Sequence, residues 1–196
     1  EQIHRVVNLA TAALEDKKYC SAIFLDVAQA FDRVWHEGLL YKIKKLLPSF
    51  YVILKSYLLN RNFAVTQDNI LSSFYPITAS VPQGSILGPF LYTPYIYDMP
   101  DPPADLRSNI EIATYADDTA FITVADTPAV AAESLQAVID VFSNWCQFWR
   151  IKLNDTKSIH ITFTLRSGIT PPVLLNQKII PQKTTVKYLG LHIDAK

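Results

Sequence analysis

The sequence predicts an α+β domain in which a β-sheet carries helices packed on one face. Short runs that are apolar or alternate between apolar and polar residues are typical of strands, and longer runs with helical spacing separate them. With 196 residues, 49% of them hydrophobic and 18% charged, the chain can bury a substantial core. We therefore expect one folded domain over residues 1–196, with its core at about 20–165.

The first two predicted elements are a helix and a buried strand. Residues 2–14 carry apolar side chains at helical spacing, and residues 21–27 form a nearly continuous apolar run. Such a run is typical of a strand covered on both faces. It contains Asp26 near its end, and a buried carboxylate is costly unless it is paired. Asp26 is therefore a candidate functional residue.

The middle of the chain predicts helices on either side of two short strands. Pro48 separates the first two helices, and Pro94 should kink the third by removing a backbone hydrogen bond. The third helix is apolar all round, so we expect it to be buried. The predicted elements are helices at 39–47 and 50–59, strands at 63–66 and 74–79, and a helix at 84–99.

A β-hairpin with acidic residues at its tip is predicted in the second half. Residues 110–115 and 119–124 alternate on either side of Asp117 and Asp118. Thr127 can cap the next helix, which Pro128 starts and which ends near Arg150. The remaining predictions are a strand at 158–164, a short hairpin ending at Ile180 and a last strand at 186–189.

Charge and cysteine content restrict the functional classes. Lys plus Arg equals Asp plus Glu at 18 each, whereas an independent nucleic-acid binder usually has a basic surface. Either the chain does not touch nucleic acid, or it is a catalytic core whose basic nucleic-acid-binding parts lie elsewhere.

Cys20 and Cys146 form no metal-spaced set with the four histidines. The apolar run 86–97 is too short for a bilayer, so we expect an intracellular protein without zinc or membrane contact.

The adjacent carboxylates suggest a metal site. Asp117 and Asp118 repel each other unless a cation or the turn geometry compensates. Asp26 is the best candidate for a third ligand from another strand. Magnesium prefers oxygen ligands and keeps waters and substrate phosphates in its shell, so a few carboxylates beside a cleft suffice. A solvated acidic pair at a turn remains the alternative.

Five blocks resemble the reverse transcriptases of non-LTR, LINE-type retrotransposons, and in particular those of jockey-like elements. They occur in the family's order over nearly the whole chain, which makes the resemblance far more specific than an Asp-Asp pair alone. The blocks are 24–34 (FLDVAQAFDRV), 81–89 (VPQGSILGP), 115–118 (YADD), 152–157 (KLNDTK) and 188–191 (YLGL). The resemblance implies a polymerase palm with a ferredoxin-like antiparallel sheet, plus part of the fingers.

The resemblance also implies a set of metal ligands. Asp26 and Asp117 would bind two catalytic Mg²⁺ ions, or Mn²⁺ in their place, with Asp118 assisting. The backbone carbonyl of Val27 would add a further ligand. Lys157 would stand near the pyrophosphate as a proton donor. A solvated lysine is the alternative for Lys157.

Substrate contacts are implied for four residues. Phe31 would lie under the incoming sugar and exclude a 2′-hydroxyl, although an ordinary core aromatic is the alternative. Gln83 and Gly84 would approach the template and the nascent base pair, glycine being suited to close contact. Their alternative is a plain turn before a helix. Tyr115 of the YADD block is assigned to substrate binding as well.

The sequence departs from the family pattern at two positions inside the blocks or beside them. Ser80 stands where glycine is common before VPQG, and Asp155 stands where proline often follows the asparagine of KLND. These changes put activity in doubt more than fold. We also expect the start of the fingers, the thumb and any endonuclease to lie outside the chain.

The function that the resemblance implies is that of an RNA-directed DNA polymerase. It would add deoxynucleotides from their triphosphates to a DNA primer on an RNA template, and it would depend on finger and thumb segments. The parent ribonucleoprotein would be cytoplasmic and nuclear. One alternative is a degenerate copy that acts at most in RNA binding or interaction. A palm-type nucleotidyl cyclase is the other, although it would not need the block 81–89.

Overall fold

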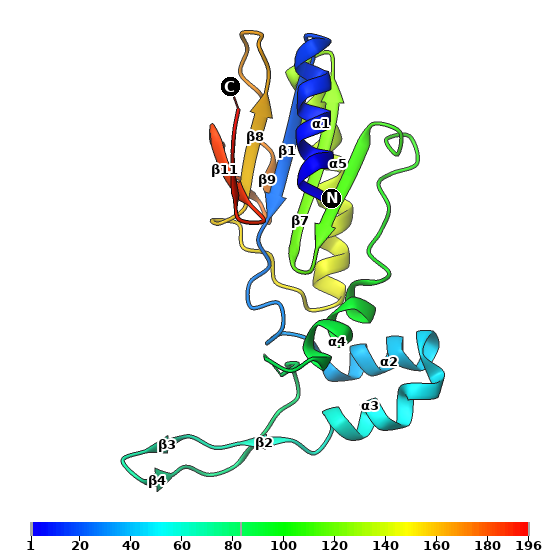
Figure 1. The fold of residues 1–196 in the computed structure, drawn as a ribbon, viewed down its shortest axis with the longest axis vertical. Coiled ribbons are helices and arrows are strands. Elements are labelled where there is room, and N and C mark those ends of the chain that lie inside the picture. Colours follow the sequence, from blue (N-terminus) through cyan, green and yellow to red (C-terminus); the bar gives the residue numbers. More distant parts are fainter. Residues whose placement is uncertain (1, 83, 196) are drawn as a thin grey trace. The chain divides into compact units, whose positions relative to one another are not determined.

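Figure 1 shows the fold in a computed structural model that describes residues 2–82 and 84–195. The backbone divides into two compact units. The first unit comprises Glu1–Ala28, Met99–Phe148 and Lys152–Lys196, and the second comprises Gln29–Asp98 and Trp149–Ile151. Each unit is built around its own core. None of the helices in the described residues is long and apolar enough to cross a lipid bilayer.

The first unit is organised around an antiparallel sheet. Among the described residues this sheet has four strands, in the order β6-β7-β1-β8. The predicted hairpin is confirmed, because β6 and β7 pair in register and Tyr115 lies opposite Asp118. The strands are β1 (Tyr19–Leu25), β6 (Ile110–Tyr115), β7 (Asp118–Ala125) and β8 (Ile159–Phe163).

Two helices cover the two faces of this sheet (Figure 1). Helix α1 (Gln2–Glu15) packs through side chains such as Val6 onto the face that includes Phe24 of β1. Helix α5 (Pro128–Phe148) packs on the other face, where the ring of Phe142 meets that of Phe121 with 5.1 Å between centroids. The α+β class and the antiparallel sheet are confirmed. The helices lie on both faces rather than one, because the strand side chains are apolar on both sides.

The predicted start of α5 is confirmed in detail. The backbone N–H of Val130 donates a hydrogen bond of 3.3 Å to Oγ1 of Thr127, and Pro128 is the first helical residue. This bond satisfies one of the N–H groups that a helix leaves without a partner in its first turn. The helix ends at Phe148, two residues before the predicted end.

Two small hairpins follow β8 in the first unit. The first was predicted, whereas the return strand of the second was not. Leu189 and Gly190 both have positive φ, 46° and 84°, which is the backbone pattern of a tight two-residue hairpin turn. The strands are β9 (Leu174–Leu175) with β10 (Lys178–Ile179), and β11 (Thr185–Tyr188) with β12 (Leu191–Asp194).

The second unit combines helices with an extended hairpin. The three predicted helices are confirmed, but the strand pairs are shorter and more numerous than predicted. Ile86 is 94% exposed just before the third helix and Phe90 is 44% exposed within it, so the expectation of burial on all sides was wrong. The helices are α2 (His36–Leu46), the 3₁₀ helix η1 (Pro48–Phe50), α3 (Tyr51–Leu58) and α4 (Leu87–Ile96). The strand pairs are β2 (Asn62–Phe63) with β5 (Tyr75–Pro76), and β3 (Thr66–Gln67) with β4 (Ile70–Leu71).

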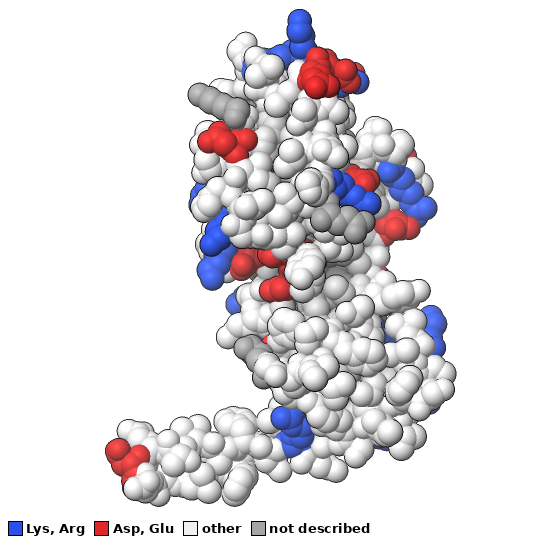
Figure 2. Space-filling model, viewed as in Figure 1, with Lys and Arg blue, Asp and Glu red and all other residues white. Residues whose placement is uncertain are grey.

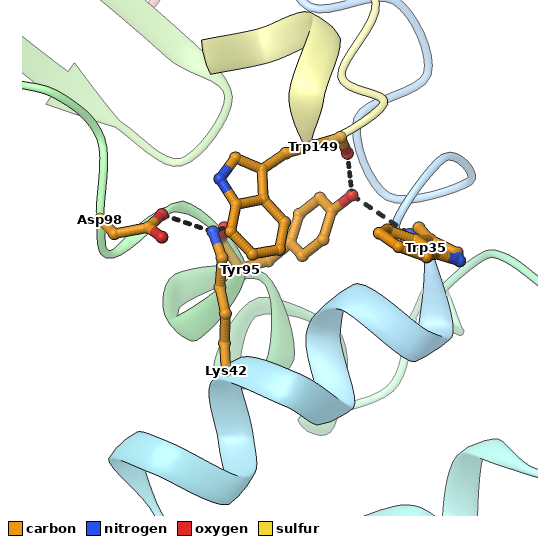
Figure 3. Close-up of polar contacts among 5 residues, drawn as sticks. All are labelled: Trp35, Lys42, Tyr95, Asp98 and Trp149. Atoms are coloured by element: carbon orange, nitrogen blue, oxygen red, sulfur yellow. Dashed lines mark hydrogen bonds and ion pairs between the residues drawn. The ribbon is translucent and has the colours of Figure 1, made fainter.

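A buried lysine joins the helices of the second unit (Figure 3). The ammonium group of Lys42 lies 3.5 Å from the ring centroid of Trp149 and forms an ion pair with Asp98. Burial lowers the pKa of Lys42, and the hydrogen bond and charge of Asp98 oppose that effect. The hydroxyl of Tyr95 accepts from the backbone N–H of Trp35 and donates to the carbonyl of Trp149. These contacts fix α2 and α4 against residues far away in sequence.

Candidate functional site

The backbone of Asp26 is held by a segment that follows it by more than a hundred residues. Asp26 comes directly after β1 and is half-buried. Its N–H donates a hydrogen bond of 3.2 Å to Oγ of Ser158, and its carbonyl accepts one of 2.8 Å from the N–H of Asn154. The N–H of Ala28 donates to the carbonyl of Lys152 at 2.8 Å. The block 152–158 therefore fixes the position of Asp26.

The register of the sheet places Asp26 and Asp118 at neighbouring strand ends. Leu25 lies opposite Thr119 in the β1–β7 pair, so the next antiparallel positions are Asp26 and Asp118. Ala116 has φ 55°, a left-handed conformation that allows the tight turn carrying Asp117. Sequence and fold thus bring the three predicted carboxylates to one end of the sheet.

The electrostatics of Asp118 reflect this arrangement. Partial burial raises the pKa of Asp118 above its ordinary value, and the charges of Asp117 and Asp26 raise it further. Burial, followed by the charge of Asp118, also raises the pKa of Tyr188 to about 12. The ring of Tyr188 packs on Phe24 at 4.9 Å between centroids. The repulsion among the carboxylates is the kind that a bound cation would relieve.

The donor set fits a divalent cation in its chemistry. Carboxylate oxygens beside solvent are the ligands that Mg²⁺ prefers. Within residues 2–82 and 84–195, however, no three His, Cys, Asp or Glu side chains are close enough together to form a ready-made metal cage. Val27 forms an isolated antiparallel β-bridge with Leu153. The backbone hydrogen bonds of this bridge are those that Asp26 and Ala28, the neighbours of Val27, make with Asn154 and Lys152. The assignment of Val27 as a ligand stays a prediction.

Two further predicted residues of the first unit are solvent-exposed. The side chain of Lys157 is exposed, while its backbone N–H donates to Oδ1 of Asn154 at 3.3 Å. Tyr115 is 64% exposed at the end of β6. Both are accessible to a substrate, and their roles stay predictions. Sequence reasoning missed Ser158, whose hydroxyl links the backbones of Asp26 and Asn154.

A pocket in the second unit contains the predicted sugar and template residues. Phe31 is half-buried, and its ring lies 5.1 Å from that of Tyr92 in α4. Gly84 lines the same pocket of about 470 Å³ with φ 77°, a conformation that favours glycine. A Cβ at Gly84 would meet no protein atom within 4 Å, so only its backbone conformation requires glycine within the protein itself. Gln83 lies outside the described residues.

Ser80, the departure from the family pattern, has a strained backbone. Its φ is 100°, a region that residues with a side chain rarely adopt. Its carbonyl accepts a hydrogen bond of 2.7 Å from Nε2 of His36, and its N–H donates to the carbonyl of Val34 at 3.0 Å. These bonds hold the strained residue in place. Glycine, common here in the resembling family, would have no such strain.

Comparison with known sequences gives consistent matches over the full chain. The family described as "Reverse transcriptase (RNA-dependent DNA polymerase)" matches residues 1–193. The chain is 46% identical over 200 residues to the RNA-directed DNA polymerase from mobile element jockey of Drosophila melanogaster. It is 44% identical over 198 residues to the jockey protein of Drosophila funebris. The alignments cover 100% and 99% of this chain and 22% of each relative, so the chain spans about a fifth of their length.

Comparison with solved structures supports the fold. Apo telomerase from Candida tropicalis, truncated from its C-terminal domain, is similar with a TM-score of 0.66 and 15% identity. That match covers 97% of this chain and 37% of the telomerase chain. Telomerase of the same organism in complex with a fragment of telomeric RNA gives a TM-score of 0.65 at 14% identity, covering 98% and 32% of the two chains.

Proposed function

Because the chain belongs to the reverse transcriptase family and is similar in sequence to jockey-like non-LTR retrotransposon enzymes, we propose that it carries out template-directed DNA synthesis. It would add deoxynucleotides to the 3′-hydroxyl of a primer on an RNA template. One observation supports this most directly: Asp26 and Asp118 occupy opposite positions at the ends of β1 and β7, with Asp117 in the adjoining turn.

The carboxylates would hold two Mg²⁺ ions, with Mn²⁺ as a substitute. Asp26 and Asp117 would bind both ions, and Asp118 and the carbonyl of Val27 would complete the set. When bound, such ions activate the attacking hydroxyl and stabilise the leaving pyrophosphate. The chain's own part is to keep Asp26 in place through Asn154 and Ser158. The raised pKa of Asp118 means that protons compete for this carboxylate at a higher pH than for an ordinary aspartate.

The remaining predicted residues would select and orient the substrates. Phe31 would lie against the deoxyribose and leave no space for a 2′-hydroxyl, while Gln83 and Gly84 would face the template and the new base pair. Lys157 would supply a proton to the pyrophosphate, and Tyr115 would contact the primer or nucleotide. Support comes from the pocket that joins Phe31 to Gly84, and from the exposure of Lys157 and Tyr115.

The partners would be an RNA template, a DNA primer and deoxynucleoside triphosphates. The relatives at 44–46% identity are named as RNA-directed DNA polymerases of mobile elements, which supports this substrate class. The parent ribonucleoprotein would work in the cytoplasm and the nucleus. Further segments of the polymerase would contribute to gripping the primer and template, since the chain spans 22% of its relatives.

The test is primer extension on poly(rA)·oligo(dT) in magnesium and then in EDTA. It is applied to the chain and to a form lengthened to match its relatives. We expect the lengthened form to extend the primer in magnesium but not in EDTA, and the chain alone to extend it poorly because it depends on further segments of the polymerase. In the lengthened form, Asp117→Asn should lose extension with an unchanged circular dichroism spectrum. Asp105→Asn, an exposed aspartate of the same unit, is the matched control and should extend normally. Near-normal extension by Asp117→Asn would refute the metal assignment. Nucleotide products formed without a template would indicate a cyclase instead.

A further inference from the structure

The neutral overall charge conceals a basic region in the second unit. This unit contains seven Lys and Arg residues against four Asp and Glu, whereas the whole chain has 18 of each kind. Residues 38–67 contain no acidic residue at all. This stretch covers most of α2, all of η1 and α3, and the start of the hairpin. In Figure 2, basic side chains appear over the helical part of this unit, and red atoms mark the tip of the hairpin, where Asp68 is the one acidic residue in this part of the sequence.

Two lysines of this region share one aromatic ring. The ammonium group of Lys44, in the last turn of α2, lies 6.0 Å from the ring centroid of Tyr51. Tyr51 is the first residue of α3, and Lys55 follows it by one helical turn. The ammonium group of Lys55 lies 5.8 Å from the same centroid. The ring attracts both cations, but the two like charges also repel each other. The ion pairs formed among the described residues include neither lysine. A negative group placed between these lysines would therefore be attracted by both.

Exposed aromatic side chains lie close to the lysine pair along the chain. Tyr41, which is 67% exposed, lies three residues before Lys44 in α2, so the two share a helix face. Phe50 is 53% exposed in η1, next to Tyr51. Exposed rings beside cations are the combination with which proteins bind single-stranded nucleic acid, the rings stacking on bases and the cations contacting phosphates.

We propose that the surface formed by Tyr41, Lys44, Phe50, Tyr51 and Lys55 binds a single-stranded segment of nucleic acid. Lys44 and Lys55 contact phosphates, and Tyr41 and Phe50 stack on bases. None of these residues lines the pocket that contains Phe31 and Gly84. The proposal rests on the proposed polymerase function only for the identity of the ligand, an RNA strand. Although the net charge of the chain is zero, this surface would give it a basic contact with nucleic acid.

The test measures RNA binding without catalysis. The 196-residue chain is titrated into a fluorescently labelled single-stranded RNA in EDTA, and anisotropy is recorded between 25 and 150 mM KCl. The double variant Lys44→Gln with Lys55→Gln is compared with Lys183→Gln with Lys187→Gln. The control pair is exposed in the first unit and changes the net charge equally. Thermal melts of both variants confirm that the fold is kept.

Loss of two phosphate contacts should reduce the slope of log affinity against log salt by about 1.4, and the affinity at 50 mM salt by on the order of tenfold or more. The control pair should leave the slope nearly unchanged. Equal effects in both variants, no effect in the first, or no RNA binding by the wild-type chain at 25 mM salt would overturn the proposal. So would lysine-dependent binding of polyglutamate in place of RNA.

The result is independent of the polymerase assay. If the lengthened wild-type protein fails to extend a primer while the slope changes as expected, the proposed function fails and the binding surface stands. If primer extension succeeds and the Lys44 and Lys55 substitutions change nothing in RNA binding, the surface fails alone.

Discussion

The stability of the first unit should depend on pH through His160, which is fully buried in β8. Burial lowers the pKa of His160 to about 4. Nε2 of the ring lies 2.7 Å from Oγ of Ser21, and Nδ1 lies 3.4 Å from the amide nitrogen of Gln182. That amide donates to the carbonyl of Thr170, so Nδ1 faces a donor and must act as an acceptor. The folded protein therefore holds a neutral imidazole.

The sign and size of the effect follow from linkage. An unfolded histidine has a pKa of about 6.5, so between about pH 6.5 and 4 the unfolded state binds a proton that the folded state does not. The free energy of unfolding should thus fall as the pH falls, by about 1.4 kcal/mol per pH unit at most. The loss should reach about 2.5 kcal/mol at pH 4.5 and level off below pH 4.

Urea denaturation followed by circular dichroism at pH 7.5, 6.0, 5.0 and 4.5 measures this loss. The comparison variant is His160→Gln, which cannot titrate at this position. It should be less stable than the wild type at pH 7.5, and the difference between the two should shrink towards pH 4.5. Subtracting the variant removes the contribution of the carboxylates, which titrate in both proteins. A difference that stays constant over this range would refute a neutral buried imidazole at His160.

Three other substitutions test the site and its surroundings. Asp118→Asn should raise the stability of the metal-free protein by about 0.5 kcal/mol, because screened repulsion is relieved, and should weaken Mg²⁺ binding in calorimetry. Ser80→Gly should raise the free energy of unfolding by roughly 1 kcal/mol in urea titrations, because glycine adopts φ 100° without strain. Phe31→Val should increase ribonucleotide use relative to deoxynucleotide use by about 10- to 200-fold in single-nucleotide incorporation, and an unchanged ratio would return Phe31 to the core.

The strongest periodic patterns predicted their elements well. The β6–β7 hairpin, the capped start of α5 and helix α1 depend on local spacing and on turn chemistry, and all three are confirmed. The continuous apolar run of β1 already implied cover on both faces, which is what α1 and α5 provide. The expectation of helices on one face was therefore inconsistent with the apolar run of β1.

Pairings between distant segments could not be predicted. Nothing local in the block 152–157 indicates that Asn154 and Ser158 hold the backbone of Asp26, because hydrogen bonds between distant segments leave no periodicity. Strands such as β4 and β12 are only two and four residues long and largely exposed, so they are too short to show a periodic pattern. The positive φ of Ser80 could not be predicted from the serine itself. The glycine that is common in the family at this position did indicate such a backbone conformation.

The order of the strands has a consequence for biosynthesis. Ile23 in β1 pairs with Phe121 in β7 and His160 in β8, so the strand is complete long before its partners leave the ribosome. At roughly 5–20 residues per second, the interval before His160 is added is about 7–30 s. Throughout that time an apolar strand with open edges is available to other chains, and contacts so distant in sequence also slow folding itself. Expression at lower temperature or with added chaperones should therefore improve the soluble yield of this protein.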